Sequence, residues 1–110
     1  MTILKIFEKV NLVAPIEQRR FFNYYEDSVN ELEAAYGDFL FKEKNKRMPE
    51  KLSDDCILLP LYAAAVCDNI LFLAGAGESF KSEFIRKSHE AYLKYWRDNA
   101  KGRHVKKGEW

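Results

Sequence analysis

The 110-residue chain contains only two cysteines, Cys56 and Cys67, which are too few for a disulfide scaffold. A chain of this length buries about two-thirds of its unfolded surface, so a single domain can fold without disulfides or a metal ion. Both cysteines lie in apolar sequence. We therefore expect reduced thiols that are buried in the core of one domain.

Long hydrophobic runs are also missing. The most apolar stretch, residues 57–76, is interrupted by Pro60, Asp68 and Asn69, and it falls short of the roughly 18 uninterrupted apolar residues that span a bilayer. The N-terminal segment MTILKIFEKV carries charges every few positions and lacks the cleavage pattern of a signal peptide. These absences predict a soluble, intracellular protein that has no membrane partner.

The sequence has no recognisable set of metal ligands or catalytic residues. The spacing of Cys56, Cys67, His89 and His104 matches no zinc-binding pattern. Nucleophilic catalysis needs a base beside the nucleophile, and His89 falls on an expected helix where a surface histidine is the simplest interpretation. We therefore predict no catalytic residue, no bound metal and no cofactor, so the chain is not expected to be an enzyme.

Two polar residues, Asp68 and Asn69, interrupt an otherwise apolar helical pattern. A buried carboxylate needs a partner. We expect a structural pairing with a basic or tyrosyl side chain rather than a catalytic role.

The segment LFLAGAGESF, residues 71–80, superficially resembles a strand that feeds a phosphate-binding loop. Gly75 and Gly77 match the first two glycines of the dinucleotide fingerprint, but Phe80 stands where the third glycine belongs. The apolar residues before the glycines also complete a long helical pattern. We therefore expect a turn between two helices, in which Gly75 or Gly77 ends one helix and Ser79 caps the next.

Charge is unevenly distributed, although the net charge is only +1. Residues 42–51 and residues 101–110 each carry +3, so the rest of the chain carries −5. Like-charge clusters of this kind often mark loops or tails that meet a partner. Sequence-specific or phosphate-directed DNA binding is less favoured, because the helix after the glycine turn contains Glu83 and Glu90 and follows Glu78.

Apolar residues recur at helical spacing along most of the chain. The pattern predicts an all-α domain with four helices near residues 2–13, 16–36, 53–73 and 79–99. Thr2 is the expected N-cap of the first helix, Pro15 the expected first position of the second, and Gly37 its expected terminator.

Two details remain open from the pattern. Ser53 and the acids after it form a good helix start, which would place Pro60 inside the third helix; the alternative is a helix that starts at residues 59–60. Residues 39–51 are compatible with a short β-hairpin or with a long loop.

The predicted organisation is a helical domain at residues 1–100 and a basic tail at residues 101–110. The tail is either a solvated end or an arm that orders on a neighbouring protein. Large amphipathic rings favour interfaces. A tail that combines cations with a tryptophan is likewise expected to bind a partner. The candidate partner-binding residues are Tyr92, Tyr95 and Trp96 on the last helix and Lys101, Arg103, Lys106, Lys107 and Trp110 in the tail.

These features together resemble the head–tail connector, or head-completion adaptor, proteins of long-tailed bacteriophages and prophages. The matching stretches are FFNYYEDSVNELEAAYG, LSDDCILLPLYAAAVCDNILFL and FKSEFIRKSHEAYLKYWRDN with the basic tail, which cover most of the chain. The resemblance implies a structural protein of the virion neck, which is present in the bacterial cytoplasm during assembly or when expressed from a prophage.

The resemblance also implies partners. The chain would form a homo-oligomeric ring that contacts the portal protein and tail-completion proteins, while DNA passes non-specifically through the channel. The alternative is a small helical regulatory or DNA-binding domain.

Overall fold

The computed structural model describes residues 2–37, 48–58 and 60–103, with no side-chain detail for residues 60, 61 and 99–103. Its helices are α1 (Ile3–Val13), α2 (Gln18–Tyr36), α3 (Pro60–Leu73) and α4 (Ser79–Arg103). The described residues contain four helices and no strand, so the predicted all-α, four-helix fold is confirmed. None of these helices combines the length and the apolar character that a membrane crossing needs.

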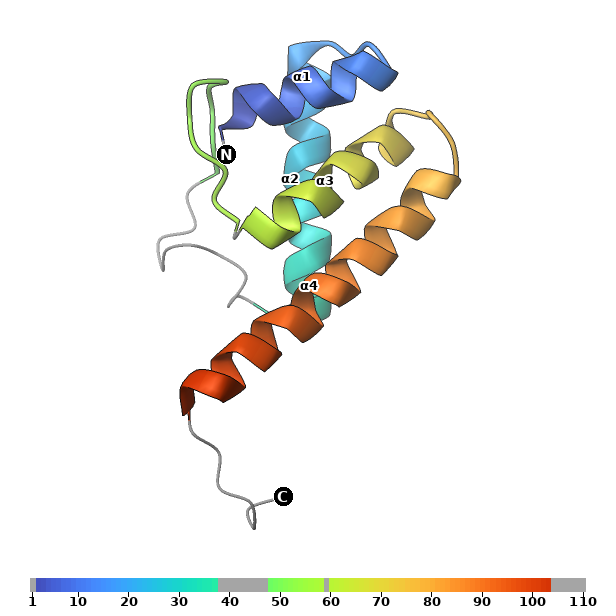
Figure 1. The fold of residues 1–110 in the computed structure, drawn as a ribbon. Coiled ribbons are helices and arrows are strands. Elements are labelled where there is room, and N and C mark those ends of the chain that lie inside the picture. The colour runs from blue at the N-terminus through green and yellow to red at the C-terminus, as the bar shows by residue number, and fades with distance from the viewer. Residues whose placement is uncertain (1, 38–47, 59, 104–110) are drawn as a thin grey trace.

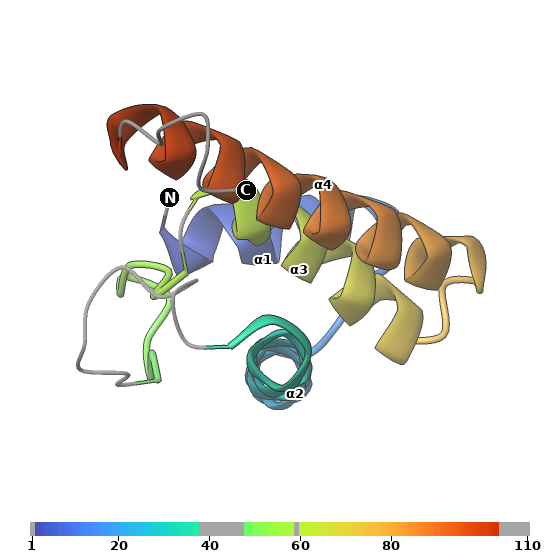
Figure 2. The same ribbon diagram turned by 90° about the horizontal axis from the view of Figure 1, so that it is seen from below.

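Helix α3 lies at the centre and packs against α1, α2 and α4 (Figure 1). It is apolar nearly all round, as a helix covered on several sides must be. Seen from below, α2 is viewed end-on while α1, α3 and α4 lie across it (Figure 2). The core is therefore built around α3, and its largest fully buried side chains include Phe21, Tyr25 and Leu32 of α2 and Tyr62 and Ile70 of α3.

The start of α1 is held by two different segments. Thr2 is the N-cap, as predicted, and its Oγ1 accepts a hydrogen bond from the N–H of Lys5. The first N–H groups of a helix have no partner within the helix. Here the N–H of Ile3 donates to the carbonyl of Asp54 and the N–H of Leu4 to that of Leu52, each at 2.9 Å.

The same contacts explain why the prediction that helix three starts at Ser53 is wrong. Asp54 does not act as a first-turn acid. Its carboxylate accepts hydrogen bonds from the N–H groups of Glu50 and Lys51, while its backbone carbonyl serves α1. Helix α3 begins at Pro60, the alternative start, where a missing N–H costs nothing. Cys56 therefore precedes α3 rather than lying on it.

Three other expected boundaries shift by a few residues. Pro15 lies in the link before α2, which begins at Gln18, so it is not the first helical position. In that link the N–H of Ile16 donates to the side-chain carbonyl of Asn11 at 2.9 Å. Ser79 is the first residue of α4 rather than its cap, and α4 continues to Arg103 instead of ending near residue 99.

The glycine turn between α3 and α4 has the expected role. Gly75 has φ +86°, and its N–H donates to the carbonyl of Phe72, while the N–H of Ala76 donates to that of Leu71. This pair of bonds is the Schellman motif that ends a helix on a left-handed residue. Gly37 likewise ends α2 at φ 91°. The segment LFLAGAGESF is thus a turn that joins two helices and not a strand with a phosphate-binding loop.

Candidate functional site

A buried polar network joins α2, α3 and α4. Asn69 of α3 is fully buried, and its amide nitrogen donates to Ser28 Oγ at 2.8 Å and to a carboxylate oxygen of Glu31 at 3.3 Å. Lys81 of α4 donates to the amide oxygen of Asn69 at 3.1 Å and forms an ion pair with Glu31. Because the amide is satisfied on both sides, its burial is tolerated. The network fixes the position of α4 on α2.

Asp68, the neighbour of Asn69, pairs with a second lysine of α4. Its Oδ2 lies 2.7 Å from Nζ of Lys87. The expectation of a structural pairing with a basic side chain is therefore confirmed for Asp68, and Asn69 also meets a lysine. Asp68 thus meets α4, and Asn69 meets both α2 and α4, so the two polar residues help to fix how these three helices dock.

An aromatic cluster lies where α2, α3 and the second half of α4 meet. The ring of Tyr36 lies 5.0 Å from that of Tyr92 and 6.3 Å from that of Tyr62, measured between centroids. Trp96 packs edge-on against Tyr92 at 6.2 Å and against Tyr95 at 5.5 Å. The two Trp96 contacts have the edge-to-face geometry that aromatic pairs prefer, with interplanar angles of 78° and 88°, whereas the two Tyr36 pairs are tilted at 33° and 49°. The cluster continues from the buried Tyr62 to Trp96, which is 41% exposed.

The hydroxyl group of Tyr62 is buried and has no hydrogen-bond partner among the described residues. Burial, and secondarily the neighbouring phenol of Tyr36, raise the pKa of Tyr62 to about 12. The neutral phenol is therefore favoured. Tyr36, by contrast, shares a hydrogen bond of 3.4 Å with Ser88 of α4.

A shallow groove lies beside this cluster, between the C-terminal part of α2 and the first half of α4. Its volume is about 200 Å³. Leu32, Phe84 and Ser88, which are buried, line it together with Glu31, Ala35, Tyr36 and Ile85. Ile85 is 56% exposed at the edge of the groove. We call this the α2–α4 groove, and the groove with Tyr92 and Trp96 the α2–α4 surface.

The structure places the predicted partner-binding residues in two groups. Tyr92, Tyr95 and Trp96 come together on α4 and lie against Tyr36 or one another. Lys101 and Arg103 belong to the last turn of α4, so the expected tail is helical over its first residues, but their side chains are not described. The expectations for Lys106, Lys107 and Trp110, and for residues 39–47 of the possible hairpin at residues 39–51, lie outside the described residues; residues 48–51 are described and contain no strand.

Sequence reasoning missed the contribution of α2 and of Ile85 to this surface. By periodicity, Tyr36 falls on the face of its helix that is expected to be buried. Ile85 lies beside the residues of the last helix that are expected to face the core. A weak signal existed, because Ile85, Tyr92 and Trp96 recur at helical spacing on one side of α4.

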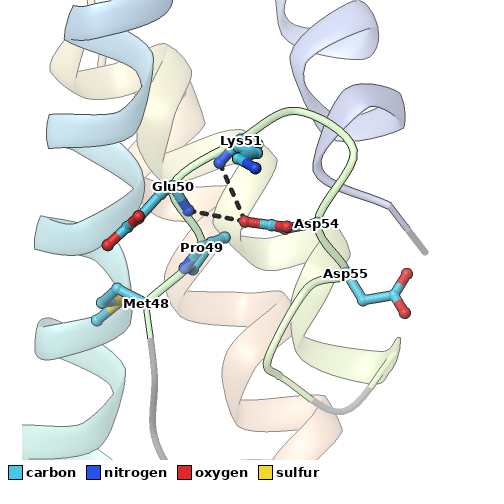
Figure 3. A pocket seen from close by; sticks show the side chains of 6 residues that line it. All are labelled: Met48, Pro49, Glu50, Lys51, Asp54 and Asp55. Atoms are coloured by element: carbon cyan, nitrogen blue, oxygen red, sulfur yellow. Dashed lines mark hydrogen bonds between the residues drawn. The ribbon is translucent and has the colours of Figure 1, made fainter.

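A second recess, of about 300 Å³, is lined by Met48, Pro49, Glu50, Lys51, Asp54 and Asp55 (Figure 3). The carboxylate of Asp54 is already occupied by two backbone N–H groups, at 2.9 and 3.0 Å. The side chain of Asp55 points away from that of Asp54 (Figure 3). The two acids therefore do not converge on a cation. Within residues 2–37, 48–58 and 60–103, no three histidine, cysteine or acidic side chains gather in a metal-binding group.

The two cysteines are free thiols in unreactive surroundings. Cys56 is buried and lies 3.1 Å from the hydroxyl of Tyr25, whose pKa is raised by burial and by this neighbour. Cys67 is half-buried, and burial raises its pKa to about 11. Since the thiolate is the reactive form, the raised pKa of Cys67 favours an inert thiol, while Cys56 is shielded from solvent by its burial. His89 is exposed, as expected.

Comparison of the chain with family models, with curated proteins and with solved structures gave no match in any of the three.

Proposed function

We propose that the chain is a structural phage or prophage head–tail connector protein. In this role copies of the chain form a ring that joins the portal to the tail and lines the DNA channel of the virion neck. The observation that carries the proposal is the α2–α4 surface, where half-buried tyrosines and the exposed Trp96 adjoin an apolar groove. Aromatic residues and a scarcity of charge distinguish the centre of a protein interface from ordinary surface.

The polar network supports the same proposal. A subunit of an assembly needs an interface whose shape is set before binding, because ordering loops and side chains on association costs affinity. Asn69, Lys81 and Lys87 hold α4 against α2 and α3, so both walls of the groove are already in place. The groove therefore belongs to the rigid body of the fold.

The alternative, a small regulatory or DNA-binding domain, is less well supported. All three lysine and arginine residues between Ser79 and Glu90 already pair with carboxylates: Lys81 with Glu31, Lys87 with Asp68, and Arg86 with Glu83 and Glu90. A helix that binds a phosphate backbone needs cations that remain available to it, so on α4 such binding would depend on the second half of the helix, which carries Lys94 and Arg97.

Native mass spectrometry and negative-stain electron microscopy of the full chain test the proposal. They would be performed on the protein alone and on the protein co-produced with the portal protein of the same phage or prophage. We expect closed rings of many copies, alone or seated on the portal. A chain that stays monomeric in both preparations, and instead retards duplex DNA at physiological salt, would favour the alternative.

A further inference from the structure

We draw no further inference here: the strongest candidate, the apolar α2–α4 groove with the exposed Ile85 at its edge, belongs to the surface already described, and nothing in the described part of the chain shows what covers it, because Glu31, the acid that lines it, is already paired with Lys81.

Discussion

The side-chain amide of Asn69 donates a 2.8 Å hydrogen bond to the hydroxyl of Ser28, and both residues are fully buried. This bond joins the central helix α3 to α2. Ser28 in turn donates to the carbonyl of Tyr24 at 2.7 Å, so the contact is tied into the backbone of α2. The buried polar groups are therefore linked by successive hydrogen bonds, and removing one side chain leaves the groups bonded to it without that partner.

The first prediction follows from this bond. Asn69→Ala should lower the free energy of unfolding by about 2–3 kcal/mol, because a cavity forms and the buried groups that Asn69 satisfied lose a partner. Asn30→Ala, at an exposed position of α2, should change it by less than about 0.5 kcal/mol. Urea unfolding followed by circular dichroism measures both. An equal, small effect of the two substitutions would contradict the assigned role of Asn69.

The second prediction compares two ion pairs of α4. A double-mutant cycle on Asp68 and Lys87 should give a coupling energy of about 1 kcal/mol or more, because Asp68 is only 8% exposed. Arg86 and Glu90, 2.9 Å apart on the surface of the same helix, should give a clearly smaller coupling energy. The cycles would use alanine substitutions and urea unfolding. Adding 1 M salt should weaken the second coupling more than the first.

The third prediction concerns the hydroxyl of Tyr62, which has no partner among the described residues. Tyr62→Phe should leave stability at neutral pH unchanged or raise it by up to about 1 kcal/mol, since no hydrogen bond is lost.

The same variant should respond differently to alkaline pH. The folded protein raises the pKa of Tyr62 from 10.0 to about 12, so below about pH 10 the phenol is neutral in the folded and the unfolded chain and its ionisation takes nothing from stability. As the pH rises from about 10 to about 12, the free energy of unfolding falls, because the unfolded chain ionises first. Tyr62→Phe should therefore lose less stability than wild type between pH 9 and about pH 11.5 in urea unfolding. Parallel curves for the two proteins would contradict the burial of this phenol.

Local signals in the sequence predicted several boundaries well. Thr2 caps α1 and Gly75 ends α3 because each acts on neighbours within a few residues, where sequence spacing fixes geometry. Ser53 gave an equally good local signal and was misleading. The carbonyls of Leu52 and Asp54 accept hydrogen bonds from the start of α1, about fifty residues earlier in the chain. A rule based on neighbouring residues cannot predict that this contact competes with a helix start at Ser53.

The candidate site also has some features that the local sequence predicts and others that depend on contacts between distant segments. The large amphipathic rings of Tyr92, Tyr95 and Trp96 predict contact with a partner. The positions of Asp68 and Asn69 within an apolar pattern predict that both need a polar partner. Their partners Lys87 and Ser28 could not be predicted, since these depend on how α3 meets α4 and α2. The groove beside Ile85 is likewise a product of two helices that cross, which periodicity within either helix does not encode.

The last prediction concerns the segment beyond α4, which carries Lys106, Lys107 and Trp110. If it is an arm that binds the portal, removing residues 104–110 should abolish binding to the portal. The melting temperature of the helical domain should stay unchanged, because the core residues in the described part of the chain lie between Ile3 and Ala91. Thermal unfolding and binding to immobilised portal protein measure the two effects separately.

Two milder variants separate the roles within the arm. Trp110→Ala should weaken binding by roughly 30-fold, mainly through faster dissociation, because a buried aromatic anchor contributes about 2 kcal/mol. Exchanging Lys106 and Lys107 for glutamine should instead slow association and flatten its dependence on salt, because charges at the edge of an interface act chiefly on the encounter. Surface plasmon resonance at low and high salt distinguishes the two patterns. If the truncated chain binds the portal as tightly as the full chain, the segment is a solvated end and the arm hypothesis is wrong.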